Sequence, residues 1–344
     1  MKTVIHFLIT DIYSGAESVA AHIIKNLPSG WDGYYAAPAG SGLEKVSAMG
    51  IKTIECNTSD INDIKRVCRE YSPDALHAHD PHMSFNCARA GIPFVAHLHC
   101  NCPWLSKLCP NSIALAYVCL RASKVICVSN SIVDSYIFKN ILKKKAAVLN
   151  NCIDAAEIRD LALEPCGESY DICFTGRLEE EKSPLEFVRV VADVKKALPN
   201  VSAVMLGDGS LRKATSALIG ELNLGANITL KGFVDNPYKY MMASKLGVLT
   251  SVVEGFGLAA AEQLLLGHPF LAYPVGGLTE IVNDRCGKLC RSKKEMCAEA
   301  VRLLSDSAYY AAKSSYAPMA AARFADMKSY MESITSWYSA LPKV

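Results

Sequence analysis

Short apolar runs alternate with amphipathic helical segments along the whole of this chain, and the alternation limits the folds that it can adopt. Strands that alternate with helices form parallel sheets with helices packed on both faces. The alternation starts again after the polar stretch at residues 164–169, and 344 residues exceed the size at which one core stops growing. The sequence therefore predicts an α/β protein with two doubly wound domains in tandem and a cleft between them, a common place for ligands.

The predicted elements follow from apolar periodicity. Strands are expected at residues 3–10, 33–37, 52–55, 75–79, 94–99, 124–128, 147–149, 170–175, 202–206, 227–231, 246–252 and 270–273. Helices are expected at residues 16–27, 61–71, 131–139, 184–197, 211–222 and 258–266, and residues 309–341 are helical in pattern.

Composition excludes several classes of protein. The 36 basic and 34 acidic side chains leave a net charge of +2, which gives no indication of nucleic acid binding. No apolar run reaches the roughly 18 residues that a membrane span needs, and the amino terminus is typical of a strand, not of a signal peptide. The 14 cysteines are scattered, so we expect them to be reduced core residues in a cytoplasmic protein.

One cluster has the residue types of a metal site. His97, His99, Cys100 and Cys102 lie close together in the sequence, and Cys109 follows. The spacing matches no closed zinc module, and a second Cys-x-x-Cys pair is missing. We therefore expect a strand end and a loop here, and no metal.

The segment from Glu254 to Glu262 carries the strongest functional signal. It follows the apolar run 246–253 and reads as a strand, a glycine-flanked turn through Gly255 and Gly257, and a helix start. This arrangement places backbone N–H groups and a carboxylate at the carboxyl end of a strand, where α/β proteins bind ligands. Two carboxylates tied to such a turn suit a ligand with both hydroxyls and phosphate, such as a nucleotide sugar.

Other strand ends carry candidate ligand groups. Arg177 and Lys182 follow a strand and can hold a diphosphate, or they form a solvated basic pair beside three glutamates. Gly15 permits close approach of phosphate at a helix start, or it is a plain turn glycine. His99 ends its strand and can contact a sugar hydroxyl, or it is a structural histidine.

Motifs that are missing narrow the chemistry. Asp-x-Asp does not occur in the sequence, so neutralisation of a diphosphate by Arg, Lys and helix dipoles is favoured over a bridging divalent cation. Neither the P-loop pattern nor Gly-x-Gly-x-x-Gly occurs, which leaves nucleotide hydrolysis and dinucleotide binding of the usual kind unsupported.

The motifs together resemble glycosyltransferase family 4 over nearly the whole chain. They are, in order, Gly15-Ala16-Glu17, Asn151 with Ile153-Asp154, Gly176-Arg177-Leu178 with Lys182, Gly207-Asp208-Gly209, Gly232-Phe233-Val234, Glu254-Gly255-Phe256-Gly257-Leu258 through Glu262, and Gly276-Gly277 with Glu280. The resemblance implies the GT-B fold of two Rossmann-like domains. An acceptor-side domain is expected at 1–153, with helix 327–344 packing back on it, and a donor-binding domain at 154–326.

The resemblance also implies roles for single residues. Arg177 and Lys182 would hold the donor diphosphate, and Glu254 and His99 would contact the donor sugar. Gly15, Gly176 and the backbone of Gly255, Phe256, Gly257 and Leu258 would approach phosphate and sugar, Phe233 and Val234 the base, and Glu262 the ribose. The implied reaction is a retaining, metal-independent transfer from a nucleotide diphosphate sugar, with UDP as the expected nucleotide.

The implied acceptor is a glycan or a lipid-linked oligosaccharide in surface polysaccharide biosynthesis. Basic residues at 139–145 and apolar residues at 104–120 could rest on the inner membrane, although a solvated helix end is the simpler interpretation of the first segment. The alternatives are a UDP-sugar epimerase of the same fold and a non-catalytic partner subunit.

Four places depart from the family pattern, one of which is Thr250-Ser251, where Pro-Ser is usual ahead of the first glutamate. Ser14 stands where a glycine is usual before Gly15, and Ser183 stands where a glycine commonly follows the lysine. Cys152 replaces the usual glycine after Asn151, so a turn that needs positive φ there would be strained. None of these changes removes a charged group from the expected site.

Overall fold

The computed structural model describes residues 1–342, so the last two residues of the expected helical segment 327–344 lie outside the described part. The chain divides into two compact units. One comprises Met1–Cys152 with Asp326–Val344, and the other comprises Ile153–Ala325. Within the described residues, no helix combines the length and the apolar character that crossing a bilayer requires.

The first unit contains a parallel sheet of seven strands in the order β3-β2-β1-β4-β5-β6-β7. The strands are β1 (Lys2–Phe7), β2 (Trp31–Ala37), β3 (Lys52–Glu55), β4 (Ala75–His79), β5 (Val95–Leu98), β6 (Lys124–Cys127) and β7 (Ala146–Val148). The helices are α1 (Gly15–Lys25), α2 (Ser41–Ala48), α3 (Ile61–Tyr71), α4 (Pro81–Ala90), η1 (Pro103–Ser106), α5 (Pro110–Arg121), α6 (Asn130–Ser135), α7 (Lys139–Leu142) and α16 (Met327–Ser339).

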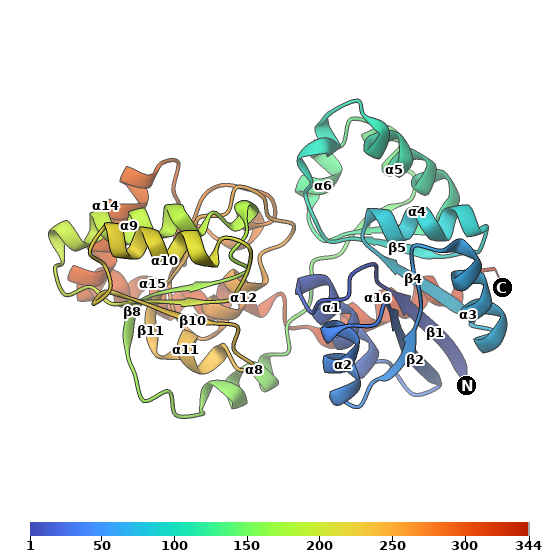
Figure 1. Cartoon of the computed structure of the whole chain (residues 1–344), viewed down its shortest axis with the longest axis horizontal. Coiled ribbons are helices and arrows are strands. Elements are labelled where there is room, and N and C mark those ends of the chain that lie inside the picture. Colours follow the sequence, from blue (N-terminus) through green and yellow to red (C-terminus); the bar gives the residue numbers. More distant parts are fainter. Residues whose placement is uncertain (343–344) are drawn as a thin grey trace. The chain divides into compact units, whose positions relative to one another are not determined.

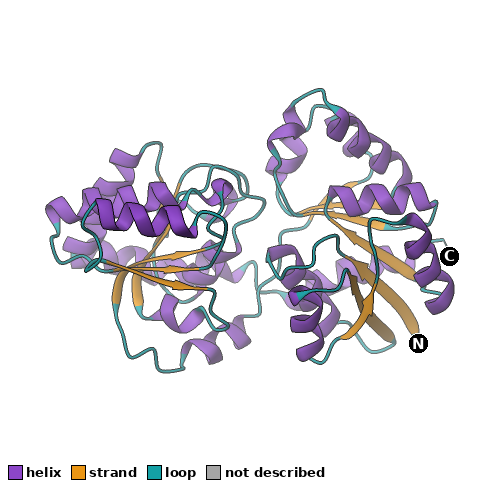
Figure 2. Cartoon of the chain, viewed as in Figure 1, coloured by secondary structure: helices purple, strands orange, loops and turns teal. Residues whose placement is uncertain are grey.

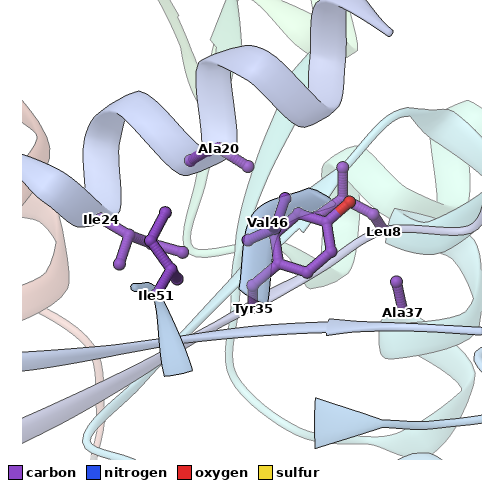
Figure 3. Close-up of a cluster of buried hydrophobic side chains, with 8 residues drawn as sticks. Leu8, Ala20, Ile24, Tyr35, Ala37, Val46 and Ile51 are labelled. Atoms are coloured by element: carbon purple, nitrogen blue, oxygen red, sulfur yellow. The ribbon is translucent and has the colours of Figure 1, made fainter. Parts of the chain in front are cut away.

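Helices cover both faces of this sheet: α4 and α5 lie over one face, and α1, α2 and α16 lie over the other (Figure 1). Figure 3 shows the apolar contact of α1 and α2 with the sheet, in which Ala20 and Ile24 pack near Tyr35 and Val46. Tyr35 and Val46 are fully buried. Burial of such side chains contributes about 1.5–3 kcal/mol each, which holds the two helices on the strands.

The second unit contains a parallel sheet of six strands in the order β10-β9-β8-β11-β12-β13. The strands are β8 (Tyr170–Thr175), β9 (Ala203–Leu206), β10 (Ile228–Gly232), β11 (Ser244–Leu249), β12 (Phe270–Ala272) and β13 (Gly287–Leu289). The helices are α8 (Ala155–Ala162), η2 (Glu180–Lys182), α9 (Pro184–Ala197), α10 (Arg212–Glu221), α11 (Tyr238–Met242), α12 (Leu258–Leu265), α13 (Leu278–Ile281), α14 (Lys293–Ser305) and α15 (Ser307–Ala322).

Alternation along β8 explains how this sheet receives helices on both faces. Cys173 packs into the apolar cluster that contains Met241 of α11. The next residue, Phe174, points to the opposite face and contacts Phe187 of α9, with ring centroids 5.2 Å apart. Strands that are apolar on both sides in this way belong in the middle of a three-layer structure, and Figure 2 shows the strands of each unit between layers of helices.

In each sheet, the first strands along the sequence are added on one side of a central strand, and the later strands are added on its other side. The strand order reverses between β1 and β4 in the first sheet and between β8 and β11 in the second. The loops after such a pair of strands diverge to opposite faces and leave a crevice at the carboxyl ends, where ligands of doubly wound proteins bind.

The structure differs from the predicted elements in a few places. The strand β13 at Gly287–Leu289 is absent from the predicted elements, because three residues are too few to give a periodic signal. The helical pattern over 309–341 is two helices, since Asp326 caps a new helix by accepting a hydrogen bond from the N–H of Ser329. The apolar run 246–253 is a strand only to Leu249, and its last residues form the loop described below.

Two departures from the family pattern have different structural outcomes. Ser183 has φ +49 and ψ +55, a left-handed conformation that costs a residue with a Cβ about 1–2 kcal/mol and that glycine adopts freely. Asn151 and Cys152 are not among the described residues with positive φ. The strain that a positive φ would have caused at Cys152 is therefore absent.

Candidate functional site

Two loops meet at the point where the strand order of the second sheet reverses. The loop after β8 contains Arg177 and Lys182, and the loop after β11 contains Glu254. Hydrogen bonds join them, because the N–H of Val252 donates to the carbonyl of Glu181 at 2.9 Å. The hydroxyl of Thr250 also donates to the carbonyl of Ser183 at 2.9 Å. These hydrogen bonds hold the loop after β8 and the loop after β11 against each other.

An ion pair crosses between these loops. Lys182 Nζ lies 2.6 Å from Glu254 Oε2, and only 18% and 10% of the two side-chain surfaces are exposed. Ser251 donates a further hydrogen bond to the same carboxylate oxygen at 3.3 Å. Since loss of one partner leaves a poorly solvated charge, the pair fixes both side chains at the mouth of the crevice.

The second predicted cation, Arg177, is more exposed and pairs with Glu181 four residues later. Glu181 therefore neutralises part of the basic pair, in agreement with the alternative interpretation of the sequence. The carboxylate of Glu179 instead accepts hydrogen bonds from the N–H and the hydroxyl of Ser210. An exposed ion pair of this kind is weak, so a stronger anion can displace Glu181.

Glycines allow neighbouring loops to approach the ion pair. Gly276 follows β12 with φ +51, and a Cβ there would lie 1.6 Å from the carbonyl oxygen of Glu254. A Cβ on Gly277 would lie 2.6 Å from the carbonyl oxygen of Gly255. On the other side, a Cβ on Gly207 would lie 2.0 Å from the carbonyl oxygen of Gly176. The backbone of neighbouring loops fills the space where these side chains would lie, so only glycine fits at these positions beside the Lys182–Glu254 ion pair.

The turn after Glu254 exposes mainly backbone groups, because two of its residues are glycines and the side chain of Phe256 is buried. Phe256 is buried and packs edge-on against Phe324, with ring centroids 5.1 Å apart. Gly257 has φ +110 and precedes the first residue of α12, Leu258. The first N–H groups of a helix have no partner within it, so they and the helix dipole favour an anion beside Gly255 and Gly257.

Glu262 lies on α12, beyond this turn. Its carboxylate is close to the hydroxyl of Tyr238, which donates to it at 3.4 Å. The side chain keeps some exposed surface, but loss of hydration around the carboxyl group raises the pKa of Glu262 to about 7. A carboxyl group in this environment gains stability when a ligand supplies hydroxyl donors.

Phe233 and Val234 follow β10 and differ in environment. Phe233 has 57% of its surface exposed, whereas Val234 is partly buried against the cluster that contains Tyr170 and Met241. Gly232 before them has φ +78, and a Cβ there would lie 2.5 Å from the guanidinium of Arg212. The exposed ring offers a flat apolar surface of the kind on which a base can stack.

Two predicted site residues belong to the first unit. Gly15 is the first residue of α1, and its loop is fixed by the buried carboxylate of Glu17, which accepts hydrogen bonds from Thr10 and Ser14. His99 follows β5 and contacts His79, with the two ring nitrogens 2.8 Å apart. Burial lowers the pKa of His99 to about 3, so the ring is neutral at physiological pH.

Sequence reasoning missed two partners in this site. The hydroxyl of Ser251 donates to Glu254, and the hydroxyl of Tyr238 donates to Glu262. No local signal identifies Tyr238, since its contact depends on how α11 packs against α12.

Both halves of the chain match families of glycosyltransferases. Residues 162–318 match the family described as glycosyl transferases group 1, and residues 13–157 match glycosyltransferase family 4. An uncharacterised glycosyltransferase of Methanocaldococcus jannaschii is 31% identical over 42% of this chain and 37% of its own length. The N-acetylgalactosamine-N,N'-diacetylbacillosaminyl-diphospho-undecaprenol 4-alpha-N-acetylgalactosaminyltransferase of Campylobacter jejuni is 38% identical over 36% of this chain and 34% of its own. The chain thus spans about a third of these relatives' length.

Solved structures extend the likeness to the whole chain. Anabaena Alr3699/HepE in complex with UDP and glucose superposes with a TM-score of 0.85 at 20% identity, covering 99% of this chain and all of that one. The lipopolysaccharide outer core galactosyltransferase WaaB superposes with a TM-score of 0.70 at 15% identity, over 99% of both chains.

The fold and the paired loops define a GT-B protein with two Rossmann-like domains, as the sequence predicted. Both halves match glycosyltransferase models, and the chain belongs to glycosyltransferase family 4.

Replacing Gly276 with alanine should lower the free energy of unfolding of the second unit by about 2 kcal/mol or more. The left-handed φ disfavours alanine, and the added Cβ would overlap the carbonyl of Glu254. Thermal and urea unfolding measure the change. Gly225→Ala is the control, because a Cβ there has open space around it. Equal losses in the two variants would contradict the account of the loop packing.

Proposed function

We propose that this protein transfers a sugar, with retention of anomeric configuration, from a nucleotide diphosphate donor to a glycan or lipid-linked oligosaccharide acceptor. The expected nucleotide is UDP, and the diphosphate is neutralised by side chains and backbone without a bridging metal ion. The setting is surface polysaccharide biosynthesis at the cytoplasmic side of the inner membrane.

The ion pair between Lys182 and Glu254 is the observation that carries this proposal. A cation and a carboxylate lie 2.6 Å apart at the reversal point of the second sheet, between glycine-lined loops. A nucleotide sugar has an anionic diphosphate directly beside a ring of hydroxyls. Lys182 suits the first group and Glu254 suits the second, and each orients the other.

The proposed reaction breaks the bond between the anomeric carbon and the diphosphate and forms a bond from the same carbon to the acceptor oxygen. Negative charge develops on the departing phosphate, where Arg177 and Lys182 stabilise it. The acceptor hydroxyl attacks from the face that the phosphate leaves, and its proton passes to a departing phosphate oxygen. No side chain is required as a general base, and neither Glu254 nor Glu262 transfers a proton.

The remaining predicted residues bind the donor. The backbone from Gly255 to Leu258 approaches sugar and phosphate, and Gly176 permits the same approach from the loop after β8. Glu262 accepts hydrogen bonds from the ribose hydroxyls, while Phe233 and Val234 contact the base. Gly15 and His99 of the first unit are proposed to meet the phosphate and the donor sugar.

Names and structures of similar proteins support the choice of substrates. Alr3699/HepE was crystallised with UDP and with UDP-glucose. The name of the Campylobacter enzyme specifies an acceptor on diphospho-undecaprenol. A similar Bacillus subtilis protein is a poly(glycerol-phosphate) alpha-glucosyltransferase, 30% identical over 34% of this chain and 18% of its own length.

Lys182→Ala and Glu254→Gln should each lower kcat/KM for transfer by about 100-fold or more, because each removes a group that faces developing charge or the sugar. Release of UDP from UDP-sugars in the presence of acceptor extracts measures the change. Lys196→Ala is the matched control, since Lys196 is an exposed lysine of the same unit paired with Asp193.

The same assay separates the alternatives. Wild-type turnover in both variants would disprove the assignment of the site. Conversion of one UDP-sugar into its epimer without acceptor would favour an epimerase over a transferase. Activity that persists in EDTA is expected, and a requirement for added divalent cation would overturn the metal-free mechanism.

The affinity for UDP-glucose should rise about tenfold between pH 6 and pH 8. Burial raises the pKa of Glu262 to about 7, so the carboxyl group is mainly protonated at pH 6 and mainly ionised at pH 8. The ionised form accepts hydrogen bonds from two hydroxyls, which makes binding stronger as pH rises through 7. Calorimetric titration measures this change, and Glu262→Gln should flatten the pH profile. An unchanged slope in this variant would remove Glu262 from the explanation.

Exposed apolar residues on the first unit support contact with a lipid surface. Ile113 and Leu120 of α5 and the preceding Leu108 each have 55–70% of their surface exposed, and Lys107 and Arg121 flank them. Such a combination of apolar and basic groups binds anionic bilayers. In the segment 139–145 the apolar Leu142 is buried and Ile141 is half-buried, so that segment supplies mainly charge.

The double variant Ile113→Ser with Leu120→Ser should lose most binding to vesicles of phosphatidylcholine with about 30% phosphatidylglycerol, since it removes apolar insertion but no charge. Co-flotation with vesicles measures binding. Leu163→Ser, at an exposed leucine of the second unit, should bind as the wild type does. Failure of the wild type to float with anionic vesicles would exclude this surface as a membrane contact.

A further inference from the structure

Five histidines lie side by side in the first unit, four of them buried on three adjacent strands and the fifth, His99, just after the last of these strands. His6 of β1 stands opposite His77 of β4 in the strand register, and His79 of β4 stands opposite His97 of β5. His99 follows two residues after His97, on the same face of the sheet. Five imidazoles in a core are costly unless their nitrogens are paired.

Hydrogen bonds connect these rings and one phenol in a single unbranched chain. From one end, His99 Nε2 bonds His79 Nδ1 at 2.8 Å, and His79 Nε2 bonds His6 Nδ1 at 2.9 Å. His6 Nε2 lies 3.3 Å from the hydroxyl of Tyr338 in α16. The same hydroxyl lies 2.6 Å from His77 Nδ1, and His77 Nε2 lies 3.1 Å from His97 Nδ1.

Both ends of this chain are buried nitrogens without a hydrogen-bond partner, His99 Nδ1 and His97 Nε2. The two ends come back together, because the rings of His97 and His99 have centroids 4.0 Å apart. His97 is fully buried, whereas His99 keeps some exposed surface. A buried imidazole nitrogen without a partner is destabilising, and two of them beside one another indicate that a ligand binds between them.

We propose that His79, His97 and His99 bind one divalent transition-metal ion of the zinc class, with the two unpartnered nitrogens among its ligands. Ligand atoms of these three residues lie within 4.8 Å of one another. Tetrahedral Zn²⁺ with bonds of 2.0–2.1 Å requires about 3.3–3.4 Å between its nitrogens, a difference that side-chain rotation can supply. All three proposed ligands belong to the first unit, and the contact of His99 with the donor sugar proposed above then applies to the metal-free protein.

The three imidazole rings are in the neutral form, which is the form that binds a metal ion. Burial lowers the pKa of His97 and His79 well below the usual value, and that of His99 to about 3, so all three are neutral and have a lone pair to offer. Imidazole nitrogen is a preferred ligand of Zn²⁺, Ni²⁺ and Cu²⁺. The remaining rings of the chain act as outer partners that fix the tautomers of the ligands.

The number of protons in the hydrogen-bonded chain predicts how many protons are released when a metal ion binds. Six neutral groups hold six protons, one each, and the chain has five hydrogen bonds that take one proton apiece. The sixth proton must sit on one of the two ends. When both ends bind the metal and His79 gives up its hydrogen bond to His99 to bind it through Nδ1, the five groups from His79 to His97 hold four protons in four hydrogen bonds, and His99 keeps one on Nε2. Five of the six protons then remain, so one proton is released to solvent for each ion bound.

The test is calorimetric titration of the full chain, first stripped of metal with a chelator, with ZnCl2 at pH 7.5. Two buffers of different protonation enthalpy give the number of protons released. We expect one ion per chain and release of one proton. His97→Asn should weaken binding by about 100-fold or more, whereas His82→Asn, an exposed histidine, should bind as the wild type does. Circular dichroism checks that each variant is folded.

Tyr338→Phe provides a second and sharper variant. It cuts the chain in the middle, so both ends can present lone pairs without loss of a proton. Zinc should still bind, but proton release should fall from one to zero. Cys102→Ser should leave binding intact. The proposal is overturned if the wild type binds no zinc at this site, if Cys102→Ser abolishes binding while His97→Asn keeps it, or if Tyr338→Phe releases as many protons as the wild type.

Discussion

Parallel pairing between β8 and β11 is the constraint on which the candidate site depends. Because Leu246 pairs with Ile172 and Gly247 with Cys173, the two strands end at the same edge of the sheet. Their loops come from distant parts of the sequence, yet Lys182 and Glu254 meet at 2.6 Å. Any change that shifted this register by one residue would turn the side chains of β11 to the opposite faces and separate the pair.

The electrostatics of the site follow from competition for two cations. Lys182 pairs with Glu254, and Arg177 pairs with Glu181. The two partners differ in burial, and this difference divides their roles. Glu254 is held by Ser251 and by the loop packing, whereas Glu181 is more exposed. In the proposed function, a donor phosphate would therefore displace Glu181 from Arg177, while Glu254 stays in place.

Much of the fold could be predicted from the sequence, because apolar runs with turn residues between them indicate strands in both halves. The motif residues of the second unit were also recognisable, since glycines and charges that gather at successive strand ends are typical of a ligand site. The packing of one helix on another, or of a helix on a strand, could not be predicted from the sequence. Tyr238 beside Glu262, and Tyr338 beside His77, depend on contacts of α11 and α16 that local periodicity does not encode.

The position of Tyr338 has a consequence for biosynthesis. The first sheet ends at β7, yet the phenol that joins its buried histidines arrives with α16, after the whole second unit. At roughly 5–20 residues per second, the roughly 190 intervening residues take about 10–40 s to synthesise. During that time His6 and His77 lack the hydroxyl that later connects them. Of the two units, the one whose synthesis starts earlier is therefore completed later, and the second unit has the opportunity to fold before it.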